Sequence, residues 1–436
     1  MLRWLSILLV VLAALGAPAA ADAGTWSPAV SIPVAGPGAF EPGVAIGADG
    51  SEVVVWIDQG GVESAVRPAG EATFDAGQNV APPPSPGGAV SRLEVVQVPG
   101  AETIALWSRA DAGLAADRIE WSARPPGGAF GPIHLVPTTG LPADHRTIEL
   151  SAAGAANGDV VLAWAGEGTQ PGGSHGFRIY GSVRPGGGEF ADPAPLSALG
   201  GLSPDVATGP NGDAVAAWLE GGGTMAGAVR EARRPPGAAF GPAHTLERKS
   251  DAGLAQPFVA AGAGGETVAV WYRRDGRTKR LHFAVRRAAN DTFGPIGTLG
   301  QAPTRRYALG GGLGGDVGAV WADRVDDRSV MRVRRRVPGH GFGTTVSLTH
   351  ASEGTRAIQV GITDNGTLLT AWQRATASDA FDLWAAGQAR TGRRTELVRL
   401  QTPAPFFAFA LAAGAGEHGV AAWTAGAPGV RVSARR

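Results

Sequence analysis

The stretch VATGPNGDAVAAW, residues 206–218, holds an apolar run, a turn built on Asn-Gly, and a second apolar run that ends in tryptophan. Asn-Gly is typical of two-residue hairpin loops with positive φ, so this stretch predicts two antiparallel strands joined by a tight turn. Similar stretches occur at residues 44–56, 150–164, 259–271 and 360–372. An internal repeat outweighs chain length as a guide to organisation, so we interpret the chain as a repeat protein.

The tryptophans show how far the repeat extends. After each one come a variable polar loop, an alternating segment that ends in arginine, and a short segment led by phenylalanine. Four short strands in such a unit predict the blade of a β-propeller, and no segment has the apolar period of a helix. We interpret the repeat tryptophans as structural core between adjacent blades rather than as ligand contacts. They stand 50 to 57 residues apart, at Trp56, Trp107, Trp164, Trp218, Trp271, Trp321, Trp372 and Trp423.

The two ends of the chain predict how the ring closes. The last unit stops after its third strand, and the segment GTWSPAVSIP at residues 24–33 resembles the missing outer strand, with Trp26 in the phenylalanine position. Pairing the two ends would cover an otherwise open sheet edge. We therefore predict an all-β fold, an eight-bladed β-propeller with four-stranded blades that is closed by its N-terminal strand. A seven-bladed ring is the alternative, because the unit around Trp107 is the least regular.

The N-terminal residues predict export. Residues 1–23 carry Arg3, an apolar run at residues 5–15 and small residues in Ala-x-Ala patterns, which is typical of a cleavable secretory signal. We therefore expect residues 24–436 to form a single propeller domain that is secreted, either extracellular or in the cell envelope. No later stretch reaches the roughly 18 apolar residues of a transmembrane helix, so we expect no membrane insertion.

The amino-acid composition limits the classes of molecule that this chain can bind. The 38 basic and 38 acidic residues balance, so we expect no nucleic acid as a partner. We also expect a monomeric chain. The absence of cysteine excludes disulfides and thiolate metal sites, and the eight histidines lack any metal-binding spacing. Asp323, Asp326 and Asp327 could bind calcium, but arginines interleave them and the spacing does not match a calcium loop. We predict no metal and no cofactor.

The residues two positions after the repeat tryptophans are the candidate ligand-binding set. Ligands usually bind propellers at the mouth of the central channel, and we expect strand ends there to rim it with three acids and three arginines. Ordinary solvated strand ends are the alternative interpretation. We also expect binding at the longer loops of units three, five, six and seven. The candidate residues at the channel mouth are Asp58, Arg109, Glu220, Arg273, Asp323 and Arg374.

Five aromatic residues lie outside the repeat positions, on or beside the third-strand segments. We expect these side chains to be more exposed than the repeat tryptophans, because their segments alternate with polar residues. They are Trp121, Tyr180, Tyr272, Phe283 and Trp384.

A tryptophan-terminated hairpin in every unit resembles the general plan of the sialidase-like bacterial propellers, whose characteristic repeat motif is the Asp-box. The resemblance implies a secreted propeller and, in its catalytic members, glycoside hydrolysis. The Asp-box itself is not matched: it places Asp-x-Gly close to an aromatic residue, whereas here the turn glycine precedes tryptophan by six positions, as Gly212 precedes Trp218. Tyr180, Tyr272 and Tyr307 are the only tyrosines, and none lies in a recognisable catalytic setting, so no catalytic residue is transferred.

We conclude from the sequence that the chain is a secreted binding or scaffold propeller that recognises a protein or a glycan without catalysis. The alternative is a glycoside hydrolase of the sialidase-like type. Such an enzyme needs two carboxyl groups about 5 to 9.5 Å apart. Asp58, Glu220 and Asp323 belong to units one, four and six, so we expect them to be too distant from one another.

Overall fold

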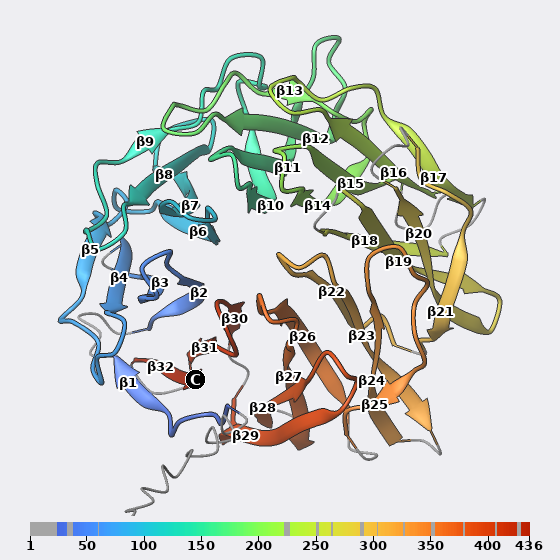
Figure 1. Ribbon diagram of the computed structural model, residues 1–436. Coiled ribbons are helices and arrows are strands. Elements are labelled where there is room, and N and C mark those ends of the chain that lie inside the picture. Colours follow the sequence, from blue (N-terminus) through green and yellow to red (C-terminus); the bar gives the residue numbers. More distant parts are fainter. Residues whose placement is uncertain are drawn as a thin grey trace, which may run out of the picture.

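The structure is a computed structural model that describes residues 24–32, 38–59, 61–221, 227–249, 253–262, 265–287, 292–302, 304–325, 328–349, 354–377, 380–405, 408–424 and 429–436. These residues form eight four-stranded antiparallel sheets, which stand as blades around a central opening (Figure 1). The predicted eight-bladed propeller is confirmed, and the seven-bladed alternative is wrong. Within the described ranges there is no helix long and apolar enough to cross a membrane. The segment predicted as a secretory signal lies outside these ranges.

Every blade has the same strand order, from the axis outwards (Figure 1). The innermost strands are β2 (Phe40–Ile46), β6 (Ala89–Gln97), β10 (Arg146–Gly154), β14 (Gly201–Thr208), β18 (Leu254–Ala261), β22 (Tyr307–Gly311), β26 (Thr355–Ile362) and β30 (Phe409–Ala413). The second strands are β3 (Glu52–Asp58), β7 (Thr103–Ala110), β11 (Val160–Thr169), β15 (Ala214–Glu220), β19 (Thr267–Asp275), β23 (Val317–Val325), β27 (Leu368–Ala377) and β31 (Gly419–Thr424).

The two outer positions complete each blade. The third strands are β4 (Gly61–Arg67), β8 (Arg118–Arg124), β12 (His175–Arg184), β16 (Gly227–Arg234), β20 (Thr278–Arg286), β24 (Arg328–Arg336), β28 (Ala380–Gln388) and β32 (Val430–Arg435). The outermost strands are β5 (Gln78–Ala81), β9 (His134–Leu135), β13 (Ala194–Pro195), β17 (His244–Lys249), β21 (Gly297–Gln301), β25 (Val346–Ser347), β29 (Arg394–Ala404) and, in the last blade, β1 (Val30–Ile32).

The seam of the ring lies in the last blade, where β1 pairs antiparallel with β32. Val30 is opposite Val432, and an isolated bridge joins Trp26 to Arg435. The backbone N–H of Ser27 also donates to the carbonyl of Ala434 at 2.7 Å. The predicted closure by the N-terminal segment is therefore confirmed (Figure 1).

The tight hairpins between first and second strands differ in detail from the prediction. In blade one, Gly50 N–H donates to the Gly47 carbonyl at 2.9 Å and Gly47 N–H donates to the Ser51 carbonyl at 2.8 Å, so the loop has three residues, not two. Gly50 has φ of 76°, but Asp49 is not among the residues with positive φ. A type I turn followed by a left-handed glycine fits this pattern. The Asp49 side chain stabilises this turn by accepting a hydrogen bond from Ser51 N–H at 3.0 Å.

The core consists of eight apolar clusters, one at each interface between neighbouring blades, and each contains one repeat tryptophan. All eight of these side chains are at most 1% exposed. The five non-repeat aromatics are less exposed than we predicted: Trp121, Tyr180 and Tyr272 are each only 2% exposed. All three belong to these apolar clusters: Trp121 and Tyr180 both lie at the interface between blades two and three, and Tyr272, on the second strand β19, lies at the interface between blades five and six.

Ion pairs made by buried arginines form a second repeated contact between blades. The arginine that ends a third strand reaches an acid in the first hairpin of the preceding blade, and this explains the arginine-terminated segments of the repeat. Each such arginine is at most 5% exposed. The pairs are Arg124–Asp49 (3.5 Å), Arg184–Glu102 (2.6 Å), Arg234–Asp159 (2.8 Å), Arg286–Asp213 (3.1 Å) and Arg336–Glu266 (2.6 Å).

Candidate functional site

The structure places the six residues predicted for the channel mouth at the ends of second strands. An innermost strand lies between each of them and the axis, and they belong to six different blades. Arg109 is 4% exposed; its Nε donates to Glu120 at 2.8 Å and its Nη2 to the Pro82 carbonyl at 2.9 Å. Asp58 is also only 4% exposed.

The other four predicted residues also have partners within the protein. Arg374 donates to Asp382 at 2.6 Å and its guanidinium lies 4.8 Å from the centre of the Trp384 ring. Arg273 pairs with Asp275 at 2.6 Å and with Glu247 of the preceding blade. Glu220 pairs with Arg230 at 3.6 Å, and Asp323 pairs with Arg332 at 3.3 Å. These ion pairs occupy much of the hydrogen-bonding capacity of the set, and its role in ligand binding stays a prediction.

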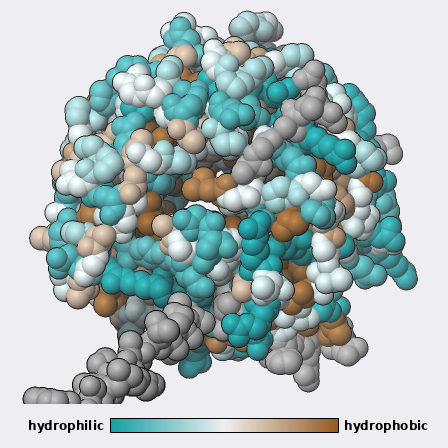
Figure 2. All heavy atoms as spheres, viewed as in Figure 1, coloured by the Kyte–Doolittle hydropathy of each residue, from teal (hydrophilic) through white to brown (hydrophobic). Residues whose placement is uncertain are grey.

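A cavity of about 360 Å³ opens nearer the axis, among the innermost strands of blades one to five and the start of the last blade. Figure 2 shows a face that is mostly hydrophilic and hollowed at its centre. Pro, Leu and Ile residues line part of the wall together with Phe409. The polar residues that line it are Glu41, Arg92, Glu94, Glu149, Ser203 and Gln256. We call this cavity the channel site.

The backbone at the channel site is unusual. Three non-glycine residues within the described ranges have positive φ, and all three line this cavity: Glu41 (47°), Arg92 (60°) and Ser203 (53°). Each coincides with a shift of register between the first and second strands of its blade. Such bulges bend the strand and redirect side chains, and residues with strained backbone are concentrated at ligand and active sites.

Acidic side chains of the innermost strands also connect the blades. The Glu41 carboxylate accepts a hydrogen bond from Leu93 N–H in the next blade at 3.2 Å. The innermost strand is the edge of its sheet, so such amides lack a strand partner and an acceptor from the neighbouring blade satisfies them. The same contact recurs from Ser203 N–H to Glu149, from Val259 N–H to Asp205 at 2.7 Å and from Leu411 N–H to Gln359 at 2.7 Å.

Glu94 differs from these acids. No hydrogen bond or ion pair to its carboxyl is found within the part of the chain that the structure describes, and part of its surface stays exposed in the channel. Burial raises the pKa of Glu94 to about 8, and the carboxylates of Asp205 and Glu41 add to this rise. Burial also raises the pKa of Asp205 to about 7, although hydrogen bonds from Val259 N–H and Ser151 Oγ favour its ionised form. Near neutral pH, Glu94 is therefore largely protonated and Asp205 is about half protonated.

The raised pKa of Glu94 predicts a pH-dependent loss of stability. Between pH 4.5, where an ordinary glutamate titrates, and about pH 8 the folded chain keeps a proton that the unfolded chain releases, so the free energy of unfolding falls as pH rises. Glu94→Gln removes this dependence. We expect the melting temperature of Glu94→Gln to exceed that of the parent chain by a margin that grows from pH 5 to pH 8, measured by calorimetry. A margin independent of pH would contradict the protonated state of Glu94.

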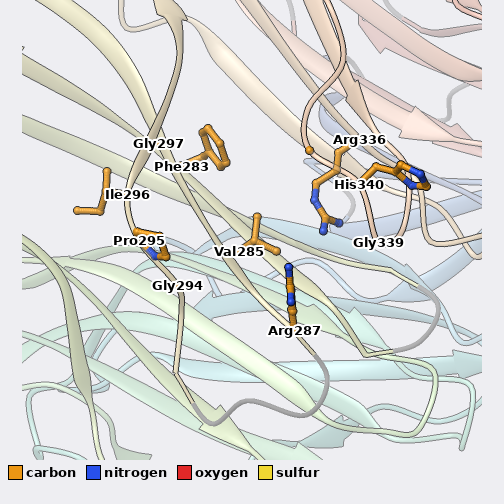
Figure 3. Close-up of a pocket in the computed structure, with 11 residues that line it drawn as sticks. Phe283, Val285, Arg287, Gly294, Pro295, Ile296, Gly297, Arg336, Gly339 and His340 are labelled. Atoms are coloured by element: carbon orange, nitrogen blue, oxygen red, sulfur yellow. The ribbon is translucent and has the colours of Figure 1, made fainter.

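A second cavity of about 540 Å³ lies at the outer rim between blades five and six (Figure 3). Phe283 and Val285 form one wall, and Figure 3 shows Arg336 beside the turn that carries His340. The residue opposite Phe283 on the outer strand is Gly297, which has no side chain to cover this wall. Arg336 is already paired with Glu266 at 2.6 Å, so the groove offers mainly apolar contacts.

The residues of the channel site were not predicted from the sequence. Glu41, Glu94, Glu149 and Asp205 lie in the first apolar run of successive units, roughly one repeat apart. An acid inside a strand that should be apolar, recurring in four consecutive units, was the available signal. Of the acids proposed for calcium, Asp326 and Asp327 lie outside the described residues. No group of three or more potential metal ligands occurs within the described ranges.

Known proteins show no more than a distant similarity to this chain. No family model matches the chain, and no curated protein sequence matches it. Among solved structures, the alpha-L-arabinanase of Penicillium chrysogenum is 14% identical with a TM-score of 0.41, covering 69% of this chain and 95% of that one. The Hadza microbial sialidase Hz136 is 13% identical with a TM-score of 0.42, covering 74% and 72%. Oligopeptidase B from Trypanosoma brucei is 10% identical with a TM-score of 0.49, covering 90% and 54%. At these identities the likeness concerns the propeller fold alone.

Proposed function

We propose that this chain is a non-catalytic binding propeller that acts outside the cytoplasm and holds a glycan in its channel site. The observation that carries the proposal is the polar cavity of about 360 Å³, lined by blades one to five and the start of blade eight. This volume lies within the range of about 300 to 1,000 Å³ that is usual for small-molecule sites. The predicted secretory signal at residues 1–23 supports the location.

The side chains of the channel site suit hydroxyl groups. A sugar hydroxyl both donates and accepts hydrogen bonds. The carboxylates of Glu41 and Glu149 accept, whereas Arg92 and the amide of Gln256 can donate. Phe409 and the neighbouring aliphatic residues provide apolar contact for the C–H groups of a sugar ring. Polar groups that fix the orientation of a ligand, beside apolar side chains that contact it, are typical of small-ligand sites.

The double variant Arg92→Ala/Gln256→Ala tests this site. Both side chains are exposed, and no hydrogen bond or ion pair to either is found within the described residues, so the variant should keep its fold. Each lost hydrogen bond to ligand costs about 1 kcal/mol, so we expect the affinity for a glycan to fall about tenfold or more. Glycans bound by residues 24–436 are first identified on an array, and their affinities are then measured by calorimetry.

The matched control is Arg393→Ala, an exposed arginine in the turn between β28 and β29, which should leave affinity unchanged. Equal affinities in the double variant, the control and the parent chain would reject the channel site. Binding of a protein at the long loops instead, with no glycan bound at all, would reject a glycan as the ligand.

Glycoside hydrolysis is the second candidate function, and the raised pKa values in the channel favour it. A carboxyl that stays protonated near neutral pH can act as a general acid. Glu94, whose pKa burial raises to about 8, would take that role. Release of 4-nitrophenol from aryl glycosides, abolished in Glu94→Gln, would support hydrolysis. Glycan binding without turnover of any aryl glycoside would leave the non-catalytic proposal standing.

A further inference from the structure

The two halves of the ring carry opposite net charges, although the net charge of the whole chain is zero. Residues 24–252, which include blades one to four, contain 24 acidic and 13 basic residues. Residues 253–436, which include blades five to eight, contain 13 acidic and 24 basic residues. Charge asymmetry of this kind is informative about binding partners even where the total is zero.

Part of the positive excess gathers at the β19–β20 hairpin and at the connection from β21 to β22. The five arginines there are exposed, and none of them takes part in an ion pair within the described part of the chain. We call them the arginine cluster: Arg274, Arg277, Arg280, Arg305 and Arg306.

The two segments of the arginine cluster lie against each other. The carbonyl of Lys279 in the hairpin accepts from Ala302 N–H at 3.0 Å, and Tyr272 N–H donates to the Tyr307 hydroxyl at 3.1 Å. The guanidinium of Arg305 lies 5.3 Å from the centre of the Tyr272 ring, which orients it over the second strand. All five arginines therefore belong to one face of the ring, because second–third strand hairpins and blade connections open on the same face.

The acidic side chains near the arginine cluster already form ion pairs with other basic residues. Asp275 pairs with Arg273 at 2.6 Å and with Lys249 at 3.2 Å, and Glu247 is buried against Arg273. Like charges placed close together repel one another, and most protein surfaces intersperse the two signs. Five arginines without a counter-charge among the described residues leave a positive field that an external anion can neutralise.

We propose that the arginine cluster binds a linear acidic polysaccharide that carries carboxylate or sulfate groups. Planar guanidinium groups form paired hydrogen bonds with such anions. The arginines are spread over an exposed surface, which suits a chain with repeated charges better than a single small anion. The acidic excess of blades one to four repels the same polymer and restricts it to the basic half. This site shares no residue with the channel site and does not depend on it.

The surroundings favour a polysaccharide over single-stranded nucleic acid. Binding of unpaired bases relies on exposed aromatic rings for stacking. The aromatic residues at the cluster, Tyr272 and Tyr307, are 2% and 6% exposed, and Tyr272 lies beneath Arg305. The cluster therefore offers a ligand electrostatic contacts without base stacking. Such contacts suit the evenly spaced anionic groups of a uronate or sulfated polysaccharide.

The test compares two charge-reversed variants of residues 24–436. Arg277→Glu/Arg306→Glu alters the cluster, and Arg393→Glu/Arg399→Glu makes the same charge change at exposed positions of blade seven. We expect the dissociation constant for polygalacturonate or heparin at low salt to rise about tenfold or more in the cluster variant and to change little in the control. Thermal melting of both variants checks that the fold is retained.

Three outcomes would overturn the proposal. The parent chain could fail to bind either polysaccharide, or the two variants could weaken binding equally, which would mean that only net charge matters. Tighter binding to a DNA duplex of matched charge than to either polysaccharide would reassign the cluster to nucleic acid. None of these outcomes bears on the channel site, which is tested at Arg92 and Gln256.

Discussion

A chain that starts at residue 33 will melt on the order of 10 °C below one that starts at residue 24, because the ring loses its seam strand. Trp26 packs in the apolar cluster between blades seven and eight, and Ile32 packs in the cluster between blades eight and one. Their side chains are 8% and 1% exposed. Burying one Trp and one Ile side chain stabilises a fold by several kcal/mol, and their loss also leaves β32 as an open edge.

Point variants separate the seam from general effects of truncation. Trp26→Ala removes a buried side chain and should cost about 3 to 5 kcal/mol. Val30→Ser, at a position that is 37% exposed in the same strand, should cost little. A synthetic peptide of residues 24–37, added to the truncated chain, should raise its melting temperature again. An unchanged melting curve after truncation would refute the closing role of this segment.

Arg286→Met should lower the free energy of unfolding by about 3 to 5 kcal/mol, since it leaves a buried charge without its partner. Arg286 is 1% exposed; its Nη2 donates to Asp213 in the preceding blade at 3.1 Å and to Thr267 at 2.9 Å. Asp213 is only 7% exposed, so little water reaches it when the guanidinium is gone. Denaturant unfolding of the variant and the parent chain measures the difference.

The double variant Arg286→Met/Asp213→Leu is the informative control. Replacing both members of a buried ion pair with apolar residues is often neutral or stabilising, so the double variant should recover most of the lost stability. Arg287→Met, one residue further along and exposed, should change stability by less than about 0.5 kcal/mol. If the single and double variants were equally unstable, the loss would come from packing rather than from the uncompensated charge.

The fold was predictable because its signals are local and repeated. Trp218 and its equivalents end runs of alternating or continuous apolar residues beside turn residues, and each unit carries the same signal. Trp26 marked the closing strand because it occupies the position of phenylalanine in the other outer strands. Loop length was predicted wrongly at Asp49-Gly50, since only the backbone torsion angles distinguish a two-residue turn from a three-residue turn that ends in a left-handed glycine.

Burial on the outer strands was harder to predict. Tyr180 and Trp121 stand in segments with polar neighbours, and the pattern alone indicated exposed aromatic residues. Trp121 faces the following blade and Tyr180 faces the preceding one, and both side chains are 2% exposed. The sequence of one unit carries no information about which side its neighbour covers.

By itself, therefore, the sequence determined the number of blades, the four strands of each blade and the segment that closes the ring, because these follow from residue patterns within single units. Tertiary structure decided the sites. Glu94 and Asp205 come together only because successive innermost strands meet around the axis, and Arg286 finds Asp213 only because the blades stack. Contacts between residues about 50 or more positions apart depend on how the blades are arranged, which no pattern within a single unit records.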